Sequence, residues 1–85
     1  EGLHQVYAPM IDISRDPRWG RVAEGPGEDP LLAARIAEAA VRGFQGEDPA
    51  GPGRVAACLK HFVAYGAPDS GREHRAACLR ALALA

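Results

Sequence analysis

The sequence has few cysteines, almost no net charge and no long hydrophobic run, and each absence argues against a class of protein. The two cysteines, Cys58 and Cys78, form no Cys-x-x-Cys pair and support neither a disulfide framework nor a zinc site, so we interpret both as small apolar residues. Ten basic and eleven acidic residues give a net charge of -1 at pH 7, which disfavours nucleic acids and anionic membranes as partners. No stretch reaches the roughly 18 apolar residues of a membrane span, and the first residues lack the basic flank of a signal peptide.

At 85 residues the chain is at most one small domain or a piece of a larger one. Residues 6–13 and 55–63 are apolar runs with almost no alternation, which is typical of strands buried on both faces. Pro9 has no backbone donor and is expected near the start of the first strand or at a bulge. We expect the Asp12 carboxylate to bond to neighbouring backbone or to an arginine of the next loop, because an unpaired buried charge is costly.

A helix is predicted between the two apolar runs. Asp29 as N-cap and Pro30 as first helical residue are a strong start signal, and the helix is expected to run to about Gly43, with Gly43 or Gly46 ending it. Residues 47–54 contain two prolines and are expected to form a surface loop. The predicted apolar stripe of the helix consists of Leu32, Ile36, Ala40 and Phe44, with Ala33, Ala37 and Val41 beside them.

The order strand, helix, strand indicates a parallel βαβ unit with a right-handed crossover. Two polar segments then fall at the same edge of the sheet, because residues 15–24 follow the first strand and Lys60 and His61 close the second. Parallel α/β sheets and barrels place their ligand sites at this carboxyl edge. We therefore expect the site here, although a lone basic pair at the end of a strand is also common on ordinary surfaces.

The segment RDPRWGR, residues 15–21, is predicted to be a loop, because Pro17 fixes its backbone and Gly20 permits unusual angles. Asp16 is interpreted as the internal acceptor of the loop, capping backbone donors or pairing with an arginine. Arg18 and Trp19 are interpreted as structural, a guanidinium and a ring that brace the loop.

Five motifs follow one another along the chain: APMIDI at 8–13, RDPRWGR at 15–21, EGPGEDP at 24–30, VRGFQG at 41–46 and VAACLKHF at 55–62. In order and spacing they resemble glycoside hydrolase family 3, the β-glucosidase and β-xylosidase family. The resemblance covers about residues 6–74. It implies a βαβ segment of a (β/α)8 TIM-like barrel, the N-terminal domain in which these enzymes hydrolyse terminal β-linked sugars with retention.

The resemblance also implies the site residues. Arg21, Lys60 and His61 match the positions that hydrogen-bond the non-reducing sugar in the subsite before the scissile bond, and Arg72 resembles a further substrate-binding arginine. The implied partners are a β-linked oligosaccharide or glycoside, the remainder of the barrel and a C-terminal domain. We expect no cofactor and no metal. The N-acetylglucosaminidase branch of the family is similar to Lys-His-Phe-Pro-Gly-His-Gly at this position. The chain shares only the first three of these residues, so this branch is disfavoured.

A retaining glycosidase needs a nucleophile and an acid/base, two carboxyl groups about 5–5.5 Å apart. In the family that this chain resembles, the nucleophile is an aspartate in a Ser-Asp-Trp type motif well downstream, and the acid/base is usually a glutamate still further on. The chain has no Asp-Trp pair, so we assign it no catalytic residue. If the resemblance were misleading, the candidate carboxylates would be Glu24, Glu28, Asp29 and Asp69.

Other classes fit the residues less well. A phosphate loop at 25–27 lacks the third glycine of GxGxxG, and the acids at 28 and 29 would repel phosphate. A metal site would need an irregularly spaced ligand set: His61, Asp69, Glu73 and His74. A non-catalytic sugar-binding remnant, or a fragment with no activity, is the more serious alternative.

The tail, residues 75–85, departs from the family pattern, and a truncated or frame-shifted reading is our hypothesis for it. A single βαβ unit leaves both faces of its sheet largely uncovered. We therefore expect the 85 residues alone neither to fold cooperatively nor to hydrolyse glycosides.

Overall fold

The computed structural model describes residues 2–62 and 64–67. Within them the elements are two 3-10 helices, η1 (Pro17–Trp19) and η2 (Val22–Glu24), followed by one α-helix, α1 (Pro30–Gln45). The predictions for Arg72, Cys78 and the tail at 75–85 lie outside the described residues. No helix in the described part has the length and apolar character needed to span a bilayer.

Helix α1 begins where the sequence predicts. The Asp29 side chain accepts a hydrogen bond from the Leu31 backbone N–H at 2.9 Å, and Pro30 occupies the first turn. Gly43 lies inside the helix, and Gly46 ends it with a φ of 62° while its N–H donates to the Arg42 carbonyl at 2.8 Å. The prediction that Gly46 ends the helix is therefore confirmed, and the alternative prediction that Gly43 ends it is wrong.

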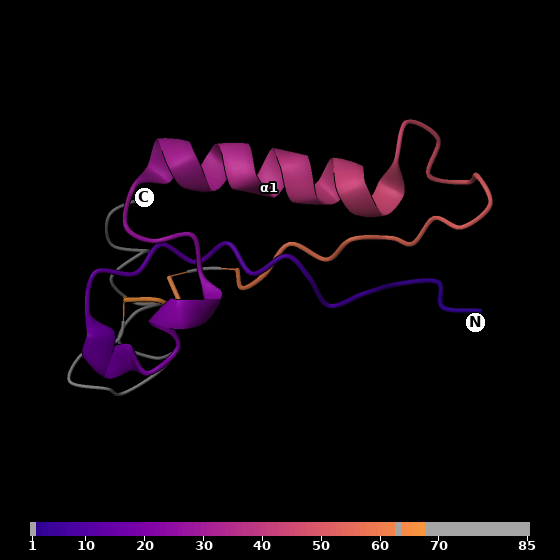
Figure 1. Cartoon of the computed structure of the whole chain (residues 1–85). Coiled ribbons are helices and arrows are strands. Elements are labelled where there is room, and N and C mark those ends of the chain that lie inside the picture. Colours follow the sequence, from indigo (N-terminus) through magenta and orange to yellow (C-terminus); the bar gives the residue numbers. More distant parts are fainter. Residues whose placement is uncertain (1, 63, 68–85) are drawn as a thin grey trace.

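Two extended segments, residues 2–13 and 54–62, lie side by side beneath α1 and run in the same direction (Figure 1). Gln5 pairs with Ala56 and Met10 pairs with Lys60, both in parallel orientation. The prediction of two parallel segments joined by a helical crossover is thus confirmed. The prediction of continuous strands is wrong, because within residues 2–62 and 64–67 these are isolated bridges, although other backbone hydrogen bonds also join the segments, such as that from the Cys58 N–H to the Ala8 carbonyl at 2.8 Å.

The spacing of the bridges explains the interruption. Five positions separate Gln5 from Met10, whereas four separate Ala56 from Lys60, so the first segment carries one extra residue between the bridges. Pro9 lies in this interval and has no N–H to donate, although its carbonyl accepts from the Lys60 N–H at 3.1 Å. An extra residue opposite a shorter partner is a bulge, which is one of the two positions predicted for Pro9.

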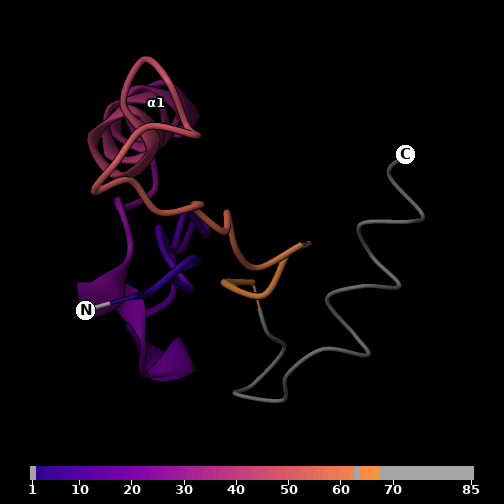
Figure 2. The ribbon, with the colours of Figure 1, turned by 90° about the vertical axis from the view of Figure 1, so that its right-hand side faces the viewer.

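Helix α1 packs over one face of this pair of segments, and the views in Figures 1 and 2 agree on that arrangement. The predicted stripe is only partly correct: Ala33 is buried, whereas Leu32 and Ile36 remain 49% and 40% exposed. The described residues therefore cover only part of the predicted apolar stripe. The loop at 47–54 lies on the surface as predicted, and Cys58 is half-buried with a free thiol.

Candidate functional site

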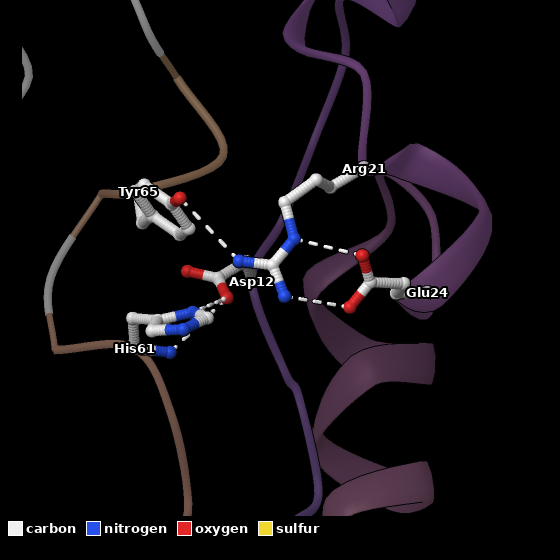
Figure 3. Close-up of polar contacts among 5 residues, drawn as sticks. All are labelled: Asp12, Arg21, Glu24, His61 and Tyr65. Carbon is white, nitrogen blue, oxygen red and sulfur yellow. Dashed lines mark hydrogen bonds and ion pairs between the residues drawn. The ribbon is translucent and has the colours of Figure 1, made fainter. Parts of the chain in front are cut away.

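The polar residues gather at the carboxyl ends of the two extended segments, as the βαβ prediction requires. Asp12 ends the first segment and η1 and η2 follow it, while His61 ends the second segment and Tyr65 follows it (Figure 3). The loops that follow the two segments come very close to the first segment, and this close approach depends on small residues. A Cβ on Gly66 would collide with the Ile13 carbonyl oxygen, and a Cβ on Gly25 would lie 3.1 Å from the Asp12 carbonyl oxygen.

The first part of the arginine loop is occupied with its own structure. The Asp16 carboxylate caps η1 by accepting from the Arg18 backbone N–H at 2.9 Å, and it accepts from the Arg18 Nε and Nη2 at 3.0 and 2.6 Å. Hydrogen bonding to the Arg18 side chain is the main reason why the pKa of Asp16 falls to about 2. Trp19 is buried at the same turn. The structural roles predicted for Asp16, Arg18 and Trp19 are therefore confirmed.

Arg21 is held from two sides. Its Nε and Nη2 donate to the two carboxylate oxygens of Glu24, each at 2.7 Å, and its Nη1 donates to the Tyr65 hydroxyl at 3.3 Å. Its guanidinium carbon also lies 5.4 Å from the centre of the Tyr65 ring. These contacts fix the plane of the guanidinium while using only part of its N–H donors, so the remaining ones can bind a polar ligand.

The Arg21 ion pair also sets the charge of Glu24. Hydrogen bonding from Arg21 lowers the pKa of the Glu24 carboxyl, and the charge of Lys60 contributes in the same direction. The pKa of Arg21 is raised in turn, chiefly by Glu24. A general acid needs a raised carboxyl pKa, so Glu24 has the opposite character.

Asp12 and His61 form the second polar pair. The Asp12 Oδ2 accepts from the His61 backbone N–H at 3.1 Å and lies 2.8 Å from the His61 Nδ1. The Asp12 side chain is 2% exposed, whereas that of His61 is 29% exposed. Asp12 is hydrogen-bonded, but the predicted partners are wrong: both bonds come from a histidine 49 positions away, rather than from neighbouring backbone or an arginine of the next loop.

Tyr65 joins the Arg21–Glu24 pair to the Asp12–His61 pair. It was not among the site residues predicted from the sequence. Besides its hydroxyl contact with Arg21, its ring lies 4.4 Å from the His61 ring and packs edge-on against Trp19 at 5.2 Å, measured between centroids. Its position four residues after His61, in the loop at the same edge, was the available signal. The tip of the ring is polar and its body apolar, so one residue can contact both arginine and tryptophan.

The chain matches the model of the "Glycosyl hydrolase family 3 N terminal domain" over residues 1–79. The chain belongs to glycosyl hydrolase family 3. It is 49% identical to the periplasmic beta-glucosidase of Salmonella typhimurium over 74 residues, which is 87% of this chain and 10% of that protein. It is 52% identical to beta-D-xylosidase 1 of Arabidopsis thaliana over 59 residues, which is 69% of this chain and 8% of that protein.

The crystal structure of the beta-glucosidase from Listeria innocua in complex with glucose superposes with a TM-score of 0.78 at 47% identity. The match covers 84% of this chain and 10% of the Listeria protein, so this family 3 chain spans about a tenth of the length of its relatives. Its fold is that of a part of the family 3 N-terminal domain, a domain of the TIM-barrel type. The resemblance deduced from the five motifs is thereby confirmed.

The family 3 chain brings Arg21, Lys60 and His61 to one edge, while Arg72 lies outside the described residues. Of the alternative carboxylates, Glu24 is paired with Arg21 and Asp29 caps α1. Asp69 is outside the described residues, and so are three of the four residues considered for a metal site. The part of the chain that the structure describes contains no group of three or more possible metal ligands.

Proposed function

We propose that this chain supplies part of the sugar-binding subsite of a retaining β-glycosidase of family 3. In this proposal Arg21, Lys60 and His61 contact hydroxyls of the non-reducing sugar, and Arg72 is a fourth contact. The observation that carries it is the convergence of Arg21 and His61 on Tyr65, with Lys60 beside them, at the edge where parallel α/β folds bind ligands. The glycosidase relatives give this edge its substrate class.

The chemistry suits a sugar. Hydroxyl groups both donate and accept hydrogen bonds, and arginine and lysine offer charged donors that are each worth roughly 1.5–3 kcal/mol. Arg21 is already oriented by Glu24 and Tyr65, so little side-chain entropy is lost when a hydroxyl binds. The reaction itself is assigned to carboxyl groups outside this chain, because Asp12 and Glu24 are each engaged with a cationic or imidazole partner.

We also propose that the chain is an incomplete barrel that functions with the remainder of a longer protein. Large apolar side chains are exposed on the described part: Leu3, Tyr7, Leu31, Leu32, Ile36, Leu59 and Phe62, the last 98% exposed. Parallel segments normally need cover on both faces, and α1 supplies it on one. The tenfold greater length of the relatives supports further barrel strands and helices as that cover.

The substitution Lys60→Ala in the complete protein tests the sugar site. We expect kcat/KM for a chromogenic β-glucoside or β-xyloside to fall by about 10- to 100-fold, since a charged donor is lost, while the melting temperature changes little. Arg35→Ala is the matched control, because it removes an exposed cation that pairs with Glu38 on α1. Equal kinetic constants for wild type and Lys60→Ala would remove Lys60 from the site.

The second candidate function is a sugar-binding or inactive remnant without hydrolase activity. It is favoured by the state of the described carboxylates Asp12 and Glu24, each of which is engaged with a basic partner. Reading the underlying gene onward in all three frames separates the two. A downstream Asp-Trp motif in any frame supports the glycosidase, whereas a stop with no such motif in any frame supports the remnant.

A further inference from the structure

We infer that Asp12 is a positioning residue that makes His61 the hydrogen-bond acceptor of the sugar subsite. The inference rests on the proposed sugar site and adds to it a residue and a direction of hydrogen bonding. The Asp12 side chain is 2% exposed and is the most buried of the three site carboxylates, ahead of Asp16 and Glu24. Its Oδ2 forms hydrogen bonds with both the backbone N–H and the ring Nδ1 of His61.

The carboxylate determines which ring nitrogen of His61 carries the proton. An ionised carboxylate can only accept, so at 2.8 Å the His61 Nδ1 must be the donor to Asp12 Oδ2. In the neutral ring the proton is then absent from Nε2, which is left as an acceptor. The backbone N–H of His61 donates to the same oxygen, and this second bond fixes the ring relative to the segment that carries it.

The surroundings of Asp12 keep this arrangement in place. Gly25 and Gly66 come from the loops on either side, and a Cβ on Gly66 would lie 3.3 Å from the Asp12 Cβ. The Tyr65 ring lies against His61 with centroids 4.4 Å apart, at an interplanar angle of 63°. Asp12 on one side and Tyr65 on the other leave the imidazole little freedom to rotate or to change tautomer.

An acceptor is what the subsite otherwise lacks among its proposed contacts. Arg21 and Lys60 can only donate, whereas a sugar hydroxyl offers both a proton and lone pairs. With Nε2 as acceptor, one hydroxyl of the sugar must donate to His61. The subsite therefore requires a proton at that hydroxyl, and a substituent that only accepts cannot replace it.

Replacing single hydroxyls with fluorine tests this requirement, because fluorine cannot donate. The assay compares 4-nitrophenyl β-D-glucoside with its 3-, 4- and 6-deoxyfluoro analogues on the complete protein. In wild type we expect kcat/KM for one analogue to fall by about three- to tenfold more than for the others. In Asp12→Ala the released imidazole can donate from Nε2, so this extra penalty should disappear.

Asp16→Ala is the matched control, since Asp16 is an aspartate of the same region that binds Arg18 instead of His61. It should keep the wild-type fluorine penalty. An unchanged penalty in Asp12→Ala, or a wild-type enzyme with no analogue singled out, would overturn the inference while leaving the proposed function intact. Loss of the proposed function itself would show differently, as a complete protein without glycosidase activity, and the inference would fall with it.

A second measurement needs no substitution at Asp12 and still tests the inferred state of His61 if Asp12→Ala does not fold. Solid-state 15N NMR of the histidine-labelled complete protein, with His61→Gln used to assign the signals, reports the tautomer directly. We expect a protonated Nδ1 and an unprotonated Nε2 at His61. The reverse pattern would overturn the inference.

Discussion

At the scale of single residues, the site is organised by paired side chains rather than by isolated basic groups. Arg21 is paired with Glu24, His61 with Asp12, and Tyr65 contacts both Arg21 and His61. Two of the residues proposed to contact the sugar, Arg21 and His61, are thus each held by a second residue that does not need to touch it. Placement of this kind matters in enzymes generally, where small displacements of a bound substrate strongly reduce the rate.

Tyr65→Phe removes the hydroxyl that accepts from Arg21 and keeps the ring that packs on Trp19 and His61. We expect kcat/KM of the complete protein to fall by about two- to tenfold, as for one ordinary hydrogen bond, with little change in melting temperature. Tyr7→Phe is the matched control, since it deletes the same hydroxyl from a tyrosine outside the contacts that join Arg21, Tyr65 and His61. A loss of melting temperature without a kinetic effect would show that the hydroxyl acts only on stability.

Asp16 gives the site loop a predictable dependence on pH. Its pKa is lowered from 3.8 to about 2 by Arg18, so the ion pair stabilises the folded state fully above about pH 4. That contribution is lost as the pH falls toward 2, where the carboxylate is protonated even in the folded protein. In urea titrations of the complete protein, the free energies of unfolding of wild type and Asp16→Asn should therefore differ most near pH 5 and converge toward pH 2. A constant difference across this range would contradict the assigned role.

At the scale of elements, glycines decide how closely the loops approach the first segment. Gly66→Ala should destabilise the complete protein by about 1–3 kcal/mol, because the new methyl group would collide with the Ile13 carbonyl oxygen. Gly43→Ala is the control with the opposite sign. It lies inside α1 with no atom within 4 Å of its added Cβ, and should stabilise by about 0.5–1 kcal/mol. Chemical denaturation measures both, and equal effects would contradict this packing.

The same elements show what the sequence can predict. The start of α1 and the cap of η1 were predictable because Asp29 and Asp16 each bond to a backbone N–H two positions on. The prediction that the two polar segments lie at the same edge followed from the order strand, helix, strand. The bulge around Pro9 and the pairing of Asp12 with His61 depend on the register between segments about 50 positions apart, which no local pattern specifies.

At the scale of the whole molecule, the described part has a small core and a large apolar surface. Trp19 and Ala33 are its buried apolar residues, whereas seven large apolar side chains are exposed. Apolar burial is the main favourable term in folding, and it must exceed the conformational entropy that ordering costs. The balance between these two terms is unfavourable for a segment with so little buried surface.

We therefore expect the isolated 85-residue chain to show no cooperative thermal transition by circular dichroism and no turnover of a chromogenic β-glucoside. The complete protein should show both. A sharp melt of the isolated chain would contradict the proposal that the remainder of the barrel covers its apolar surface, and turnover by it would place catalytic carboxylates within these residues.

The most direct test of the sugar site compares two arginines of one loop. Arg18 and Arg21 each form an ion pair with a nearby acid, but Arg18 stabilises the loop and we propose that Arg21 contacts the substrate. Lysine cannot reproduce either bidentate geometry, so Arg18→Lys and Arg21→Lys disturb comparable ion pairs. We predict that Arg21→Lys lowers kcat/KM of the complete protein for a chromogenic β-glucoside by about 10- to 100-fold, and that Arg18→Lys lowers it by less than about threefold. Equal losses, or a larger loss for Arg18→Lys, would contradict the account.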